Sequence, residues 1–114
     1  MVSCVKNNMI TSQKISEIVF NIASNHNPEQ IILFGSYAAG NPNEDSDLDL
    51  IVIKNSNLTR QHRSSEIRKS LLGSLVPIDI LVYTKKEFDE EKMLKYSFIS
   101  NAIKNSKVLY ERNS

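Results

Sequence analysis

Residues 35 to 50 of this 114-residue chain read GSYAAGNPNEDSDLDL and hold the residue types from which a phosphate site can be built. Gly35 and Ser36 directly follow the apolar run QIILF, residues 30–34, which predicts a buried strand. Glycine lets the backbone turn sharply and approach a ligand closely. Ser36 would begin a short helix through residues 37–39, whose first N–H groups favour an anion. We therefore expect Gly35 and Ser36 to bind phosphate.

Two carboxylates follow this turn at a regular spacing. Asp47 and Asp49 occupy alternate positions at the start of the apolar run DLDLIVI, residues 47–53, which predicts a strand. Their Cα atoms would lie roughly 6.5 Å apart with both side chains on one face. Paired ionised carboxylates repel each other unless cations lie between them, and oxygen ligands suit Mg²⁺ or Mn²⁺. A site with two such ions would stabilise the attacking and the leaving oxygen at phosphorus.

A third carboxylate interrupts another apolar segment. Asp79 lies within PIDILVY, residues 77–83, which otherwise predicts a buried strand. A carboxylate is costly to bury unless it is paired or bound to a metal. Asp79 is therefore the expected partner of the first two carboxylates.

The order Gly35-Ser36, ten residues, Asp47-x-Asp49 resembles the signature of the polymerase-β-like nucleotidyltransferase superfamily. The small size is similar to its minimal nucleotidyltransferase (MNT) branch, many members of which are antitoxins of HEPN/MNT toxin–antitoxin pairs. The resemblance implies an α/β (α+β) fold with a small mixed sheet flanked by helices. It also implies that residues 1–114 form a single nucleotidyltransferase domain.

The same resemblance implies an activity and assigns roles. A Mg²⁺-dependent enzyme would transfer AMP from ATP to a hydroxyl group, with Asp47 and Asp49 as metal ligands and catalytic residues. Asp79 would complete the metal site or accept the proton of the attacking hydroxyl, and Gly35 and Ser36 would hold the triphosphate. The chain has no residues for an added acceptor-binding domain, so the implied acceptor is a tyrosine of a partner HEPN-domain toxin.

One position departs from the family pattern GS-x-A-R-G, because Ala39 stands where the arginine is usual. Its absence removes a charge-assisted contact with phosphate or acceptor. Two alternatives therefore stay open. The protein would be an antitoxin that neutralises its partner by binding alone, or a small-molecule nucleotidyltransferase that completes its acceptor pocket by forming a homo-oligomer.

The remaining elements predict an alternation of helices and strands. Apolar residues at helical spacing, a crossover between the two strands that carry aspartates, and a Thr84 to Glu87 capping box support this interpretation. Helices are expected over Ser12–Asn25, Arg60–Leu75, a segment that opens at residues 84–87, and Tyr96–Lys104; an edge strand is expected over Lys107–Tyr110.

Composition indicates a soluble globular protein. Fourteen basic and 13 acidic residues give a net charge of +1, but residues 54–114 hold 12 basic against seven acidic residues. We interpret these basic residues, among them Arg60, Arg63 and Arg68, as solvated helix faces. They are too dispersed for direct polynucleotide binding. The absence of a long apolar segment favours a cytoplasmic protein with no membrane contact.

Overall fold

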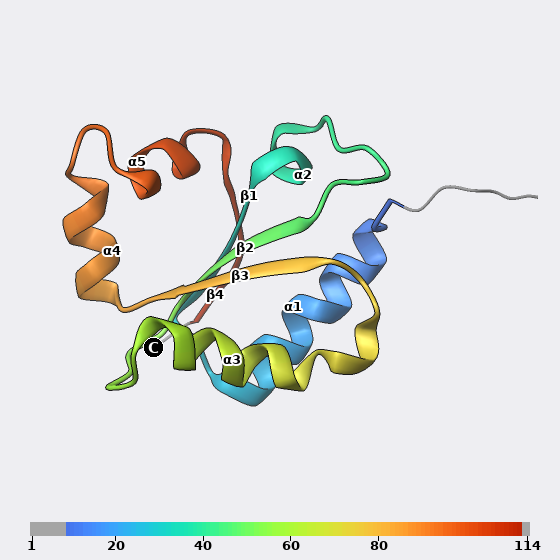
Figure 1. Cartoon of the computed structure of the whole chain (residues 1–114), viewed down its shortest axis with the longest axis horizontal. Helices are drawn as coiled ribbons and strands as arrows, with labels where there is room; N and C mark the ends of the chain where they lie inside the picture. Colours follow the sequence, from blue (N-terminus) through green and yellow to red (C-terminus); the bar gives the residue numbers. More distant parts are fainter. Residues whose placement is uncertain (1–8, 113–114) are drawn as a thin grey trace, which may run out of the picture.

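The computed structural model describes residues 9–112 of the chain (Figure 1). Helices and strands alternate along most of it. In chain order the elements are α1 (Ser12–His26), β1 (Gln30–Phe34), α2 (Gly35–Ala39), β2 (Leu48–Ile53), α3 (Arg60–Ser70), the 3₁₀ helix η1 (Leu72–Ser74), β3 (Ile78–Tyr83), α4 (Lys85–Lys92), α5 (Phe98–Ala102), the 3₁₀ helix η2 (Ile103–Asn105) and β4 (Lys107–Glu111).

A four-stranded mixed sheet with the strand order β3-β2-β1-β4 forms the centre of the fold. Strand β1 pairs antiparallel with both β2 and β4, whereas β2 and β3 are parallel. Parallel strands need a crossover connection, and α3 supplies it as expected. The small mixed sheet and the edge strand β4 are thus confirmed.

Helices cover both faces of the sheet (Figure 1). On one face α1 and α3 pack against alternate residues of β2, such as Leu50 and Val52. On the other face α4 and α5 pack through Phe88 and Ile99 against Ile51 and its neighbours. Phe88, Ile99 and Ile51 are each at least 95% buried. Strand β2 is central in the sheet and is covered by helices on both faces.

The last turns of the helices differ from the prediction. A continuous helix over Arg60–Leu75 is wrong, because α3 ends at Ser70 and a 3₁₀ turn follows. The hydroxyls of Ser70 and Ser74 bind the carbonyls of Ile67 and Leu71, which competes with helix continuation. Leu75, the last residue of the predicted helix, lies outside α3 and is 91% exposed.

The C-terminal helix is also shorter than predicted. Helix α5 begins at Phe98 rather than at Tyr96, with Ser97 as its N-cap, and continues as η2 after Ala102. The Ser97 hydroxyl accepts a hydrogen bond from the Ser100 N–H, which fixes the first turn. Phe98, the first residue of this helix, is 49% exposed.

The helix starts of α1 and α4 follow the sequence signals. Thr11 caps α1, and the predicted capping box of α4 is confirmed, with Thr84 and Glu87 each binding the backbone of the other. Among residues 9–112, no helix combines the length and apolar character needed to cross a membrane. The cytoplasmic location stays a prediction.

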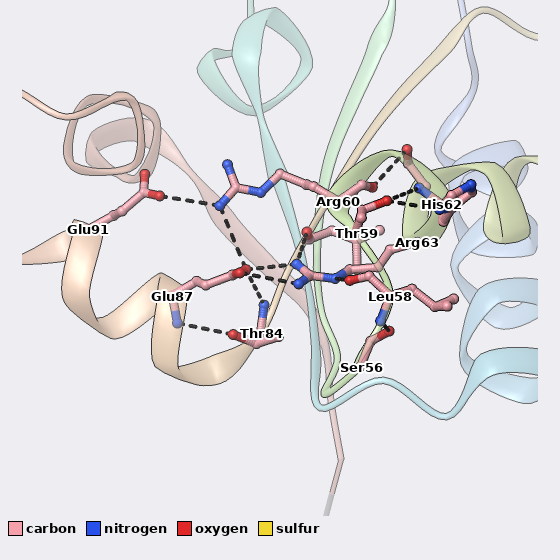
Figure 2. A network of polar contacts seen from close by, with 11 residues as sticks. Ser56, Leu58, Thr59, Arg60, His62, Arg63, Thr84, Glu87 and Glu91 are labelled. Atoms are coloured by element: carbon pink, nitrogen blue, oxygen red, sulfur yellow. Dashed lines mark hydrogen bonds and ion pairs between the residues drawn. The ribbon is translucent and has the colours of Figure 1, made fainter.

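Arg63 is the centre of a polar network that joins α3, β3 and α4 (Figure 2). Its guanidinium donates to both oxygens of Glu87 at 2.7 and 3.2 Å, and to the carbonyls of Leu58 and Val82 at 2.8 and 3.2 Å. The hydrogen bond from Arg63 lowers the pKa of Glu87 to about 2. The interpretation of Arg63 as a solvated residue is wrong, because only 9% of it is exposed.

Replacing Arg63 is expected to destabilise the fold more than replacing its neighbour Arg60. Arg63→Met keeps the length of the side chain but removes the guanidinium that donates to both oxygens of Glu87 and to two carbonyls, at a cost of about 3 kcal/mol. Arg60→Met removes longer ion pairs of an exposed side chain and should cost at most about 1 kcal/mol. Urea denaturation of both variants measures this difference, and equal losses would contradict it.

Candidate active site

The sheet brings two of the predicted carboxylates to neighbouring positions. Asp49 on β2 pairs in register with Asp79 on β3, and on its other side with Phe34 on β1. Side chains at paired positions of neighbouring strands share a face, so Asp49 and Asp79 lie on the face that α4 and α5 cover. These residues form a row at one end of the sheet.

Gly35 follows Phe34 directly and closes the row on the β1 side. Its backbone has a φ of +75°, and a Cβ on this residue would collide with a carboxylate oxygen of Asp49. Both facts require glycine, because other residues are strained at positive φ and add an atom in space that Asp49 occupies. The predicted sharp turn is confirmed, and the group that this turn approaches within the chain is Asp49. The close approach to a ligand stays a prediction.

The loop between α2 and β2 positions Asp47. Asn43 makes a local turn in which its side chain accepts from the Asp45 N–H at 2.8 Å, while its own N–H donates to the Ser46 hydroxyl at 2.9 Å. Asp47 lies just before β2 and is exposed. Its negative charge nevertheless contributes to a raised pKa of the Asp49 carboxyl.

The three aspartates are electrostatically coupled at Asp49. Burial raises the pKa of the Asp49 carboxyl above its ordinary value, and the charges of Asp79 and Asp47 raise it further. A carboxylate held between two others is stabilised by a cation in the same place. The donor set consists of oxygen atoms, which fits a hard divalent cation such as Mg²⁺.

Asp79 has a cationic partner that sequence reasoning did not identify. The Arg68 guanidinium at the end of α3 donates to Oδ1 of Asp79 at 3.1 Å, and both side chains are about half exposed. Within residues 9–112, no group of three or more His, Cys, Asp or Glu side chains has the spacing of a metal site. For the carboxylates to surround a cation, their side chains must therefore move and Asp79 must leave Arg68. This ion pair is exposed, so its loss costs little.

Ser36 lies in α2, the short helix that the sequence predicted. Its N-cap residue, Phe34, supplies no side-chain hydrogen bond to the first turn. Gly35, Ser36 and Ala39 line one side of a cavity of about 390 Å³, and α5 and η2 line the other. The structure therefore places both predicted phosphate-binding residues beside an open space on the carboxylate side of the sheet.

A mixed sheet that ends in a Gly-Ser turn beside three coupled aspartates defines a nucleotidyltransferase scaffold. Residues 13–114 match the family described as Polymerase beta, Nucleotidyltransferase. The chain belongs to this family, as a minimal nucleotidyltransferase, and is a nucleotidyltransferase enzyme.

Two relatives agree with this assignment. A Methanocaldococcus jannaschii protein, provisionally named a protein adenylyltransferase, is 33% identical over 82 residues, which cover 72% of this chain and 78% of the relative. The crystal structure of a provisionally assigned nucleotidyltransferase from Sulfolobus solfataricus superposes with a TM-score of 0.62. The superposition covers 88% of this chain and 79% of the Sulfolobus solfataricus chain, and the two sequences are 21% identical. This similarity supports the fold.

The two glycines of the α2 region offer a matched test of the contact with Asp49. Gly40 has a φ of +86° but open space around it, so Gly40→Ala should cost only the strain of a left-handed residue, about 1–2 kcal/mol. Gly35→Ala adds a collision with Asp49 and should cost clearly more. Denaturation midpoints of the two variants measure the difference, and a similar cost for both would contradict this account of Gly35.

Asp49→Asn is expected to raise the melting temperature by a few degrees in the absence of divalent cations. The substitution removes an ionised group held beside two like charges, a gain of the order of 1 kcal/mol. Mg²⁺ should raise the melting temperature of the unsubstituted protein by mass action and leave that of Asp49→Asn unchanged. Asp45→Asn, in an exposed part of the same acidic segment, is the control. A destabilised Asp49→Asn variant would contradict the proposed repulsion.

Proposed function

We propose that this nucleotidyltransferase is Mg²⁺-dependent and transfers AMP from ATP to a tyrosine hydroxyl of a partner HEPN-domain toxin, for which it acts as the antitoxin. The observation that carries the enzymatic part is the row in which Asp49 lies between Gly35 and Asp79. It brings together the turn that would bind phosphate and the carboxylates that would bind cations. The antitoxin role and the HEPN partner rest on the family resemblance.

The row gives the reaction a direction. The nucleotide belongs on the β1 side, where Gly35 and Ser36 would hold its phosphates, and the acceptor belongs on the β3 side, beside Asp79. The acceptor oxygen bonds to the α-phosphorus while the bond from this phosphorus to the pyrophosphate oxygen breaks. Asp79 takes the proton of the attacking hydroxyl, and the pyrophosphate leaves with the negative charge of the broken bond.

Asp47 and Asp49 would hold the divalent cations, together with Asp79 once it leaves Arg68. When bound, Mg²⁺ supplies positive charge to the phosphate oxygens and to the developing negative charge of the leaving group. The chain's own contribution is to orient these groups. Strand β2 fixes Asp49, and the Asn43 turn fixes the entry of the chain into Asp47.

A protein acceptor has support from the relative and from the surface. The Methanocaldococcus jannaschii relative is provisionally named for the modification of proteins. In this chain, the segment between α4 and α5 exposes three large apolar side chains, Met93, Leu94 and Tyr96, at 82, 59 and 84%. An apolar groove of about 800 Å³ also runs between α1 and β4. Exposed apolar surface of this kind is typical of contacts with another macromolecule.

A second function, neutralisation by binding alone, is favoured by one observation. Ala39 replaces the usual arginine, and no cationic side chain among the described residues lines the cavity beside Ser36. A chain of this kind would bind its partner with the same surface and transfer nothing. The two functions differ in their dependence on the aspartates.

Transfer of label from α-labelled ATP to the co-encoded partner is the measurement that separates them. With Mg²⁺ present, the unsubstituted chain should label the partner, and Asp47→Asn/Asp49→Asn should not. Asp79→Asn should slow the transfer by about 10²-fold to 10⁴-fold, because general-base help is lost.

Asp45→Asn serves as the control, because it removes an acid of the same loop that has no role in the proposed reaction. Its transfer rate should equal that of the unsubstituted chain. If no label appears and the double variant still binds and neutralises the partner, the protein is an antitoxin that acts by contact. Label on a small acceptor by a homo-oligomer, without any protein partner, would instead favour a small-molecule nucleotidyltransferase.

A further inference from the structure

The cavity beside Ser36 lies next to the row of site residues and on the same face of the sheet. Phe34, which is paired in register with Asp49, forms its floor together with Gly35 and Ser36. Helix α5 and the turn η2 form the opposite wall, at the end of the sheet where α2 lies (Figure 1). Its volume of about 390 Å³ is within the range of small-molecule sites.

The lining of this cavity is aromatic and amide-rich. The rings of Phe34 and Phe98 meet edge to face, with centroids 5.6 Å apart and an interplanar angle of 87°. Phe98 is half exposed, so part of its ring is accessible to a ligand. Asn101 and Asn105 are exposed, and among the described residues their side-chain amides have no hydrogen-bond partner.

The lining of this cavity is uncharged, which indicates which part of a nucleotide would fit it. No acidic or basic side chain of the described residues lines the cavity. A triphosphate carries several negative charges, whereas its nucleoside is neutral, has an aromatic face and has donors and acceptors along its edge. Aromatic side chains bind such faces by stacking, and amide groups bind such edges by paired hydrogen bonds.

We propose that this cavity is the nucleoside subsite of the enzyme, in which the base stacks on Phe98 and its edge bonds to the amides of Asn101 and Asn105. The assignment rests on the proposed function, namely that the donor is a nucleoside triphosphate and that Asp79 lies on the acceptor side. The order of the row supports it. Asp79 on β3 marks the acceptor side, so the cavity beside β1 lies on the opposite side, where the donor's nucleoside remains.

The departure at position 39 has a structural consequence in this account. Ala39 lines the cavity, with an exposed side chain. An arginine at this position would place bulk and charge at the wall of the nucleoside subsite. The missing arginine therefore leaves room for the base, in addition to removing a phosphate contact.

Binding measurements with two probes test the subsite without relying on catalysis. Isothermal titration of the chain with Mg-ATP and with inorganic triphosphate plus Mg²⁺ separates binding of the nucleoside from binding of the phosphates. Phe98→Leu keeps the apolar contact with Phe34 and removes the stacking ring. We expect this variant to bind ATP about 10-fold more weakly and triphosphate as before.

Two further variants test the hydrogen bonds from Asn101 to the base and the space beside Ala39. Asn101→Ala should reduce the difference in affinity among ATP, GTP, CTP and UTP, and Ala39→Arg should weaken ATP more than triphosphate. Tyr96→Ala, which removes an exposed aromatic ring outside the cavity, is the control and should bind both probes unchanged.

The outcomes of these binding measurements distinguish a failure of the nucleoside subsite from a failure of the proposed donor. If the unsubstituted chain binds ATP more tightly than triphosphate and Phe98→Leu removes this advantage, the subsite is supported. If the chain binds ATP tightly and Phe98→Leu, Asn101→Ala and Ala39→Arg all leave that affinity unchanged, the subsite is overturned while the nucleotidyltransferase function stands. Binding of neither probe by the unsubstituted chain would overturn the subsite together with the proposed donor.

Discussion

Asp49 lies against the backbone of Gly35, in space that any other residue at position 35 would fill. The turn into α2 and the place of the central carboxylate both depend on this contact, which lies at the end of the antiparallel pairing of β1 with β2. It joins the Gly-Ser turn to the carboxylates of the site through a single pair of residues. The parallel pairing of β2 with β3 then brings Asp79 into register with Asp49. Strand β2 therefore determines how Gly35, Asp49 and Asp79 lie relative to one another.

The remainder of the fold keeps the two layers of helices in place around this strand. Arg63 is buried between α3 and α4 and bonds both Glu87 and two backbone carbonyls. It thereby connects the crossover on one face of the sheet with the helices on the other (Figure 2). The layer of α4 and α5 supplies Phe98 and the wall of the cavity opposite Ser36.

Local signals in the sequence were enough to predict the strands and the starts of α1 and α4, and the structure brings two of the three predicted aspartates, Asp49 and Asp79, into register. Strand β1 and the capping box of α4 depend on neighbouring residues, and both are confirmed with their boundaries. Contacts between side chains on different elements of the chain were not predicted. Arg63 and Arg68 look like ordinary helix residues in sequence, and only the packing of α3 beside β3 shows that one is buried and the other contacts Asp79. The helix that carries Phe98 was predicted, but helical spacing does not distinguish the wall of a cavity from a packed interior, so the exposure of Phe98 was not.

The distribution of charge explains how an acidic site can accept a polyphosphate. Four acids lie between residues 44 and 49, and Asp79 is close to them through its register with Asp49. Arg68 is the cation of the described residues that contacts a site aspartate, and it lies on the β3 side. The cavity beside Ser36 is neutral, and Ala39 adds no charge to it. Repulsion between the aspartates and a triphosphate would therefore dominate unless divalent cations entered with the nucleotide. For this reason the site is expected to recognise a metal–nucleotide complex as a unit, with the phosphates bound through the cation and the backbone turn, and with the neutral cavity binding the nucleoside.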